Sequence, residues 1–310
     1  MLLEVKNVIK RYGDDLALDH ISFGIQEGEV FGLLGPNGAG KTTTISILSG
    51  LRSYDGGEVK FQGKELKRNE MDIKRQLGVV PQEIALFEDL SAYENLDYFG
   101  RLYGLKGKFL KERIEEALAF TGLTDRQKSK PKGFSGGMKR RLNIACAIVH
   151  RPKLIIMDEP TVGIDPQSRN HILQSIKELN RLGSTIIYTS HYMEEVEEVC
   201  TKIAIVDRGR VIANGTKEEL TSLVSAEEML DIELSSVNFT IVERIKEIQT
   251  VRDCIVTGSR LEIIGTKGER NVNKIVQILS EQDCEIISLN VKKPSLESVF
   301  LTLTGRSLRD

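Results

Sequence analysis

The feature that most constrains this sequence is a glycine-rich stretch that fits the pattern GxxxxGK[ST], namely Gly35, Pro36, Asn37, Gly38, Ala39, Gly40, Lys41 and Thr42. A strand is predicted before it, over Glu29–Leu34, and a helix after it, from Thr42 to about Ser49, with Gly50 placed to end the helix. Between a strand and a helix, such a loop points backbone N–H groups at a bound anion, which also meets the positive end of the helix dipole. The alternative is a glycine turn with a chance lysine, but every fixed position of the pattern matches in the required context.

This loop predicts a nucleotide site in which each polar residue has a role. We expect Lys41 to contact the β- and γ-phosphates and the Thr42 hydroxyl to bind Mg²⁺, with Thr43 beside it on the nucleotide. Downstream, the apolar run Leu154–Met157 is typical of a buried strand and is followed by Asp158 and Glu159. The carboxyl ends of such strands face the ligand site in folds of this kind.

The two acids complete a predicted hydrolytic site. Asp158 would hold Mg²⁺ through water, and Glu159 would accept a proton from an attacking water. A strand that ends in two acids is by itself also typical of a solvated strand end. Paired with the phosphate loop, it favours hydrolysis of the nucleotide.

Charge and cysteine usage exclude other classes. Lys and Arg number 43 and Asp and Glu number 45, so the formal charge of −2 provides no basic field for nucleic acid. Cys146, Cys200, Cys254 and Cys284 form no metal-ligand or disulfide pattern, which predicts reduced thiols. The N-terminus lacks a signal peptide's apolar region, and no apolar run approaches the ~20 residues that span a bilayer. We therefore expect a chain that does not cross a membrane by itself.

The chain is predicted to form two domains, at residues 1–222 and 228–310. In the first, strands alternate with helices, which favours a mainly parallel sheet covered by helices. Besides those above, its predicted elements are strands at Leu3–Val8, Ile21–Gln26 and Thr185–Thr189, and helices at Lys111–Thr121, from Pro166 to before Gly183, and after a capping box at Thr216 and Glu219.

The second domain is predicted to be a small ferredoxin-like α+β domain, because its elements follow the order β-α-β-β-α-β. They are expected at Met229–Leu234, Phe239–Ile248, Val251–Val256, Arg260–Ile264, Asn271–Leu279 and Glu285–Val291, followed by a helix over Leu296–Leu303. The patterns leave its role open, and we hypothesise regulation or stabilisation of a dimer.

A third motif indicates a family. Phe134-Ser135-Gly136-Gly137-Met138 resembles the LSGGQ signature of ATP-binding cassette (ABC) proteins, and it lies between the phosphate loop and the acid pair. Ser135 is also a plausible helix N-cap, with two glycines beside it that suit an anion. Phe134 and Met138 depart from the usual leucine and glutamine, so the contact made by the final signature position is left open.

The resemblance assigns roles to four further residues. Tyr12 matches the aromatic residue that stacks on adenine, Gln82 the Q-loop glutamine that contacts Mg²⁺ or water, Asp165 the D-loop aspartate, and His191 the switch histidine that meets the γ-phosphate. A core or surface role for Tyr12, and a structural one for His191, are the alternatives.

The resemblance covers residues 1 to about 220 and implies a P-loop ATPase fold with a helical subdomain at about 86–150. Phe134–Leu142, Thr161–Pro166 and the ending Leu296–Arg306 are similar to bacterial drug-resistance, sodium and related exporters, whose permease is a separate polypeptide. The resemblance implies that the chain binds ATP and Mg²⁺. It also implies a homodimer in which Ser135, Gly136 and Gly137 contact the ATP of the other chain. The expected location is the cytoplasmic face of the cell membrane.

Three questions stay open at this point. A soluble ABC ATPase acting on ribosomes or DNA is the alternative function, although this chain has one cassette, no long heptad insertion and no cysteine cluster. The sequence does not identify the exported substrate, whether drug, sodium, lipid or polysaccharide, because an ATPase subunit does not need to contact it. The aromatic residues between Leu86 and Leu105 either contact a permease or fill the core of the helical subdomain.

Overall fold

The computed structural model describes residues 1–66, 70–223, 227–266, 271–282, 284–292 and 295–304. Gly305 and Arg306, at the end of the exporter-like C-terminal motif, lie outside the described residues. The described chain divides into two compact units between Thr216 and Lys217.

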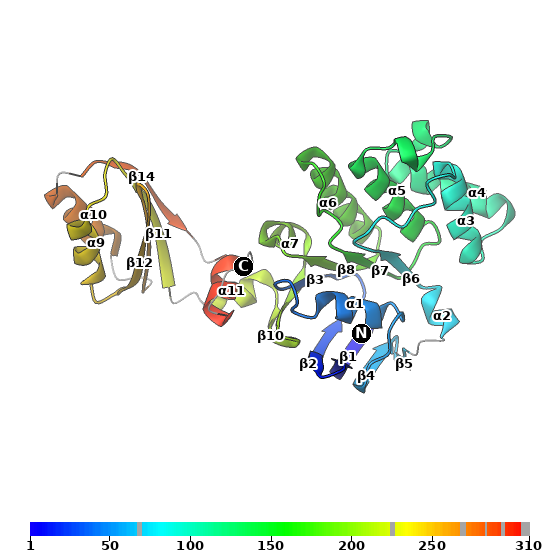
Figure 1. Ribbon diagram of the computed structural model, residues 1–310, viewed down its shortest axis with the longest axis horizontal. Helices are drawn as coiled ribbons and strands as arrows, with labels where there is room; N and C mark the ends of the chain where they lie inside the picture. The colour runs from blue at the N-terminus through cyan, green and yellow to red at the C-terminus, as the bar shows by residue number, and fades with distance from the viewer. Residues whose placement is uncertain (67–69, 224–226, 267–270, 283, 293–294, 305–310) are drawn as a thin grey trace. The chain divides into compact units, whose positions relative to one another are not determined.

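The first unit contains two sheets (Figure 1). A six-stranded sheet has the order β10-β9-β3-β8-β7-β6, in which every neighbouring pair is parallel except β10 with β9. Its strands are β3 (Val30–Leu34), β6 (Leu77–Val80), β7 (Leu154–Asp158), β8 (Thr185–Ser190), β9 (Lys202–Asp207) and β10 (Arg210–Gly215). The mainly parallel sheet is therefore confirmed, and β3, β7 and β8 lie where the sequence predicts them.

A separate four-stranded antiparallel sheet contains the first two strands of the chain. Its order is β2-β1-β4-β5, with β1 (Leu3–Tyr12), β2 (Asp15–Ile25), β4 (Gly56–Phe61) and β5 (Lys64–Glu65). β1 and β2 extend beyond the predicted ranges because they pair along a hairpin that turns at Gly13, whose φ is +60°. One hydrophobic core joins this sheet, helix α1 (Lys41–Leu48) and the central strands.

Helices surround the parallel sheet (Figure 1). They are α2 (Met71–Lys74), α3 (Ala92–Leu102), α4 (Gly107–Phe120), α5 (Gly136–Ile148), α6 (Pro166–Arg181) and α7 (Met193–Val199), with short 3₁₀ turns at Thr124–Arg126 and Pro131–Gly133. α6 begins at Pro166 and ends before Gly183, as predicted; Asp165 is its N-cap, and the φ of Gly183 is +94°.

The second unit begins with α8 (Lys217–Ser222), which the sequence had grouped with the first domain, and has the predicted β-α-β-β-α-β order. β11 (Glu227–Leu234), β12 (Val251–Thr257), β13 (Arg260–Thr266) and β14 (Ile286–Lys292) form an antiparallel sheet of order β12-β13-β11-β14. α9 (Phe239–Lys246) and α10 (Asn271–Glu281) share its apolar core. α11 (Leu296–Thr304) packs against α8.

Each unit thus has a core of its own. In the second unit, alternate strand residues such as Leu230 and Ile232 are buried, and so are Ile241 and Ile245, one helical turn apart on α9. In the part of the chain that the structure describes, no helix has the length and apolarity required to cross a bilayer.

Candidate functional site

Four predicted site segments follow neighbouring strands of the six-stranded sheet. β3, β8, β7 and β6 lie side by side and run parallel. The phosphate loop follows β3, His191 follows β8, Asp158 ends β7, and Gln82 comes two residues after β6. Because parallel strands end at the same edge of a sheet, these segments meet there although they are up to 156 positions apart in the chain.

The phosphate loop wraps around its own lysine. Gly38 and Gly40 have φ values of +78° and +103°, a left-handed conformation that glycine adopts without strain. The buried Lys41 Nζ donates hydrogen bonds to the carbonyl oxygens of Gly35 at 2.6 Å and Pro36 at 3.1 Å. Beside it lies a cavity of about 190 Å³, lined by Ala17, Pro36, Asn37, Gly38, Gly40, Lys41, Thr42, Thr43, Gln82 and Glu159.

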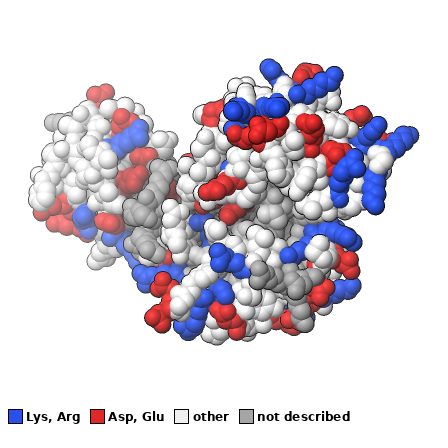
Figure 2. All heavy atoms as spheres, turned by 45° about the vertical axis from the view of Figure 1, so that its right-hand side comes forward, with Lys and Arg blue, Asp and Glu red and all other residues white. Residues whose placement is uncertain are grey.

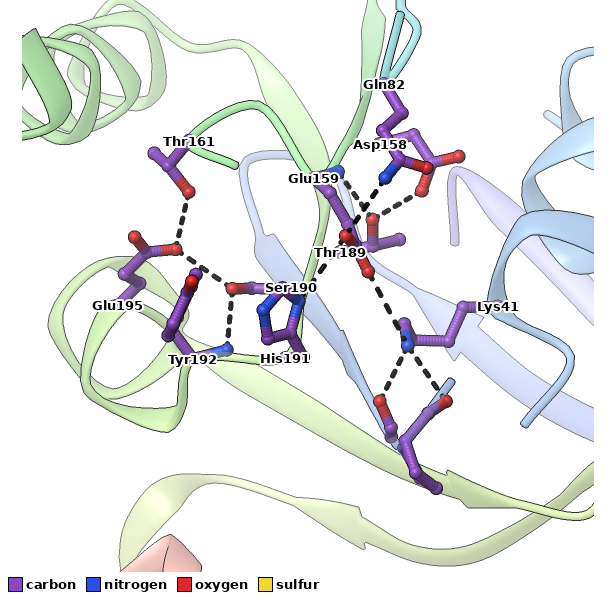
Figure 3. A network of polar contacts seen from close by, with 12 residues as sticks. Lys41, Gln82, Asp158, Glu159, Thr161, Thr189, Ser190, His191, Tyr192 and Glu195 are labelled. Atoms are coloured by element: carbon purple, nitrogen blue, oxygen red, sulfur yellow. Dashed lines mark hydrogen bonds and ion pairs between the residues drawn. The ribbon is translucent and has the colours of Figure 1, made fainter. Parts of the chain in front are cut away.

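The Glu159 carboxylate is the point where the other predicted groups meet (Figure 3). Its Oε1 lies 3.7 Å from Lys41 Nζ, and its Oε2 accepts a hydrogen bond of 3.4 Å from Gln82 Nε2. His191 Nδ1 is also 3.4 Å from Oε2, although the contact lacks the alignment of a hydrogen bond. A nearly buried carboxylate thus has an ammonium, an amide and an imidazole around it.

Thr189 positions Asp158 and Glu159, although the sequence predicts it only as the end of a strand. The backbone N–H of Glu159 donates to Thr189 Oγ at 2.9 Å, and that hydroxyl donates to Asp158 Oδ1 at 2.6 Å. The N–H bond holds Glu159 at φ +44°, a left-handed conformation that costs a non-glycine residue of order 1–3 kcal/mol. Thr189 pairs with Asp158 in the sheet, so only the β7–β8 register reveals this role.

Burial disfavours the charged forms of Lys41 and Asp158, so ligands of opposite sign would stabilise those charges. Burial lowers the pKa of Lys41, while the carboxylates of Glu159 and Asp158 act in the opposite direction. Burial also raises the pKa of Asp158, opposed by the Thr189 hydroxyl. A phosphate beside Lys41 and a cation beside Asp158 would each favour the charged form.

The signature and D-loop residues form a second group. Ser135 is the N-cap of α5 and accepts the Met138 N–H at 3.2 Å, while Asp165 caps α6 by accepting the Ser168 N–H at 2.9 Å. The buried Gly137 faces Ser168, so the signature and D-loop helices meet at this glycine. The signature and D-loop residues are also connected to the residues around Glu159.

Arg140 connects the signature helix to the Q-loop segment. From α5, its guanidinium donates to the carbonyl oxygens of Pro81 and Gln82. The signature helix is therefore tied to the backbone of the Q-loop residue. No signal in the sequence singled out this arginine.

Tyr12 lies apart from the carboxylate cluster. At the end of β1, its side chain lines a separate cavity of about 470 Å³ together with Lys10, Arg52 and Ser46. Lys10 Nζ and Arg52 Cζ lie 5.6 and 5.3 Å from the centre of its ring. The ring is 40% exposed, which leaves it accessible, and its role in stacking on adenine stays a prediction.

The comparisons with known proteins agree with this architecture. A profile of the ABC transporter family matches residues 18–162. The chain is 46% identical to the linearmycin resistance ATP-binding protein LnrL of Bacillus subtilis, with all of both chains covered. It is 38% identical to a Nod factor export ATP-binding protein I of Cupriavidus metallidurans, over 100% of this chain and 99% of that one.

Solved structures resemble the first unit. The ATP-binding subunit of an ABC transporter matches with a TM-score of 0.67 and 32% identity, over 72% of this chain and 93% of that one. The ATP-binding cassette MJ0796, in a dimeric post-hydrolysis state bound to ADP and Pi, matches with a TM-score of 0.63 and 28% identity, over 69% of this chain and 98% of that one.

The fold and the matches define an ABC ATPase, an enzyme that binds and hydrolyses ATP. The chain belongs to the ABC transporter family, among the ATP-binding subunits of the drug-resistance and exporter type. The alternative of a soluble ATPase acting on ribosomes or DNA is not favoured.

The two signature glycines give a matched pair of substitutions. A Cβ on Gly137 would lie 2.1 Å from Ser168 Oγ and 2.6 Å from Ser168 Cβ, whereas one on Gly136 would have its nearest neighbour at 3.9 Å. We expect Gly137→Ala to destabilise the fold by about 1–3 kcal/mol through overpacking. Gly136→Ala should be neutral or stabilising by up to about 1 kcal/mol, because it lowers the entropy of the unfolded chain. Urea unfolding measures both, and equal stability of the two variants would contradict the packing of α5 on α6.

Proposed function

We propose that this chain is the ATPase subunit that energises an exporter whose membrane-spanning permease is a separate polypeptide. The observation that carries the proposal is the convergence of Lys41, Gln82 and His191 on the Glu159 carboxylate. Such a cluster places a proton acceptor beside a phosphate loop, as hydrolysis requires. The roles that follow are part of the same proposal.

Glu159 is the proposed general base. It takes a proton from water as the water oxygen forms a bond to the γ-phosphorus, and the bond from that phosphorus to the β-phosphate oxygen breaks, which leaves ADP and phosphate. Lys41 stabilises the negative charge of the phosphates, and His191 contacts the γ-phosphate from the end of the neighbouring strand β8. The backbone of Gly35–Gly40, with Thr43, holds the phosphates, and Tyr12 stacks on adenine.

Thr42, Gln82 and Asp158 are the proposed holders of Mg²⁺. The buried Asp158 carboxylate faces the same strand edge as the loop, and Mg²⁺ is usually held by one or two carboxylates together with substrate phosphates. When bound, the ion would neutralise charge on the β- and γ-phosphates.

The chain is proposed to act as a homodimer. Ser135 and Gly136 are exposed, and Asp165 is exposed at the start of α6, so the second group of motif residues presents a surface rather than filling its own phosphate site. The proposed contact places this surface on the ATP of a second copy, as the dimeric state of MJ0796 suggests. ATP closes the dimer and hydrolysis reopens it, and each step moves the permease.

Dimer formation should depend on bound, unhydrolysed ATP. With Glu159→Gln, we expect light scattering to report twice the monomer mass in Mg-ATP and the monomer mass in ADP, because only ATP has the γ-phosphate that bridges the chains. Adding Lys41→Ala should abolish the dimer by removing the phosphate contact. Monomers that carry bound ATP would contradict the proposed arrangement.

A surface on the helical subdomain is proposed to contact the permease. Among the aromatic residues of this segment, Phe87 and Tyr98 are 45% and 47% exposed, and we call these two the aromatic patch. Tyr93, Phe99 and Tyr103 are half-buried. The rings of Phe87 and Tyr98 meet edge to face at 4.7 Å between centroids. This difference in exposure supports a permease contact for the two exposed rings and a packing role for the three half-buried ones.

Asn95 makes the aromatic patch rigid. The buried amide accepts the Phe87 N–H at 2.9 Å and donates to the carbonyl oxygens of Phe87, Leu90 and Ser91. The loop before α3 is thereby fixed to the helix. A preformed apolar surface loses little conformational entropy when a partner binds, which suits a protein interface.

Truncating the aromatic patch should weaken the subunit's hold on its permease. We expect Phe87→Ala with Tyr98→Ala to reduce recovery of a co-expressed permease in a co-purification, while ATP binding by the subunit is retained because neither ring lies at the phosphate loop. Leu182→Ala, which removes a 64% exposed leucine at the end of α6, is the control. Undiminished recovery with the double variant would rule out this docking surface.

The remaining parts of the proposal concern place and organisation. We propose an ABC domain over residues 1–222, a helical subdomain at about 86–150, and an accessory domain at 228–310 that regulates or stabilises the dimer. Basic and acidic side chains are interspersed over the face shown in Figure 2, which supports a protein partner over nucleic acid. We place the subunit in the cytoplasm, peripheral on the inner face of the membrane that holds its permease.

A further inference from the structure

Glu195 is a buried acid beside the hydrolytic site, and neither the motifs nor the proposed mechanism use it. It lies in the first turn of α7 and is 3% exposed. A carboxylate at that depth is costly unless hydrogen bonds compensate for its lost hydration. The partners that compensate here come from segments that carry two of the proposed catalytic groups.

One oxygen of Glu195 accepts three hydrogen bonds, and those from Thr161 and Ser190 are drawn in Figure 3. The donors to Oε2 are the hydroxyls of Thr161 at 2.8 Å, Tyr188 at 2.7 Å and Ser190 at 2.9 Å. Burial raises the pKa of Tyr188 well above its ordinary value, so this phenol stays protonated and able to donate. The other oxygen, Oε1, lies 3.3 Å from Arg169 Nε on α6.

Two of the three donors lie beside proposed catalytic residues in the chain. Thr161 lies two residues after Glu159, and Ser190 lies directly before His191. The Ser190 hydroxyl also accepts a hydrogen bond of 2.9 Å from the Tyr192 N–H. This bond links the residues before and after His191. The carboxylate therefore ties the segment that follows the general base to the turn that carries the switch histidine.

We propose that Glu195 is a positioning residue, which holds Glu159 and His191 in the mutual geometry that hydrolysis needs by bonding Thr161 and Ser190 at once. This inference rests on the proposed catalytic roles of those two residues. The contact between them is 3.4 Å long and unaligned, so it does not fix their geometry by itself. Displacement of reacting groups by about 1 Å can lower a rate on the order of 100-fold.

The test compares turnover with ATP binding in variants of the full-length chain. Glu195→Gln retains the shape of the side chain but removes the charge that strengthens the three hydrogen bonds. We expect kcat to fall on the order of 10-fold or more while the dissociation constant for ATP stays at the wild-type value, since the phosphate loop is untouched. Glu194→Gln, which alters an exposed neighbour on α7, should leave both constants unchanged.

Variants of single donors distinguish positioning from a purely structural role. Thr161→Val, Ser190→Ala and Tyr188→Phe each remove one buried hydroxyl from the same carboxylate oxygen, and Ser190→Ala also removes the acceptor of the Tyr192 N–H. A purely structural role therefore predicts losses of kcat that follow the losses of stability. Positioning predicts larger losses of kcat for the first two, whose residues flank Glu159 and His191. These substitutions also serve if Glu195→Gln does not fold.

Reference variants separate failure of this inference from failure of the proposed function. Wild-type kcat in Glu195→Gln, equal kcat in the three donor variants, or a loss of ATP affinity that parallels the loss of kcat would each overturn the role of Glu195. If Glu159→Gln and His191→Ala themselves turn over ATP at the wild-type rate, the catalytic assignments fail and the role of Glu195 fails with them.

Discussion

The parallel pairing of β7 with β8 is the constraint on which the rest of the site depends. It sets Asp158 opposite Thr189, so that one hydroxyl accepts the Glu159 N–H and donates to the Asp158 carboxylate. A shift of one residue in this register would turn Thr189 to the other face of the sheet. The left-handed turn at Glu159 would then lose its hydrogen bond, and the carboxylate would lose its direction toward Lys41.

Burial of charge explains why this arrangement suits a nucleotide. Lys41, Asp158 and Glu159 are all nearly buried, and isolated ions at such depth are costly. Their mutual attraction compensates in part, at a Lys41–Glu159 distance of 3.7 Å. The phosphates of Mg-ATP are opposite in charge to Lys41, and its cation is opposite in charge to the two acids. Binding of Mg-ATP therefore compensates for the charge burial that the fold alone leaves uncompensated.

Local chemistry could be predicted from the sequence wherever it depends on neighbours along the chain. The phosphate loop, the cap at Ser135, the start of α6 at Pro166 and the order of the second unit are of this kind, because glycine conformations, helix starts and strand alternation are short-range properties. The antiparallel sheet was not predicted, because β1 needs both β2 and the later β4 as partners. The roles of Thr189, Arg140 and Glu195 depend on register and helix packing between distant segments, which no local pattern encodes.

The central claim is that Glu159 performs the proton transfer in a site assembled from four strand ends. A single-turnover measurement of ATP hydrolysis by Glu159→Gln, alongside its dissociation constant for ATP, tests this claim most directly. The account predicts a rate lower by a factor on the order of 100 or more, with ATP affinity retained because the phosphate loop is intact. Hydrolysis at the wild-type rate by a variant that binds ATP normally would contradict it.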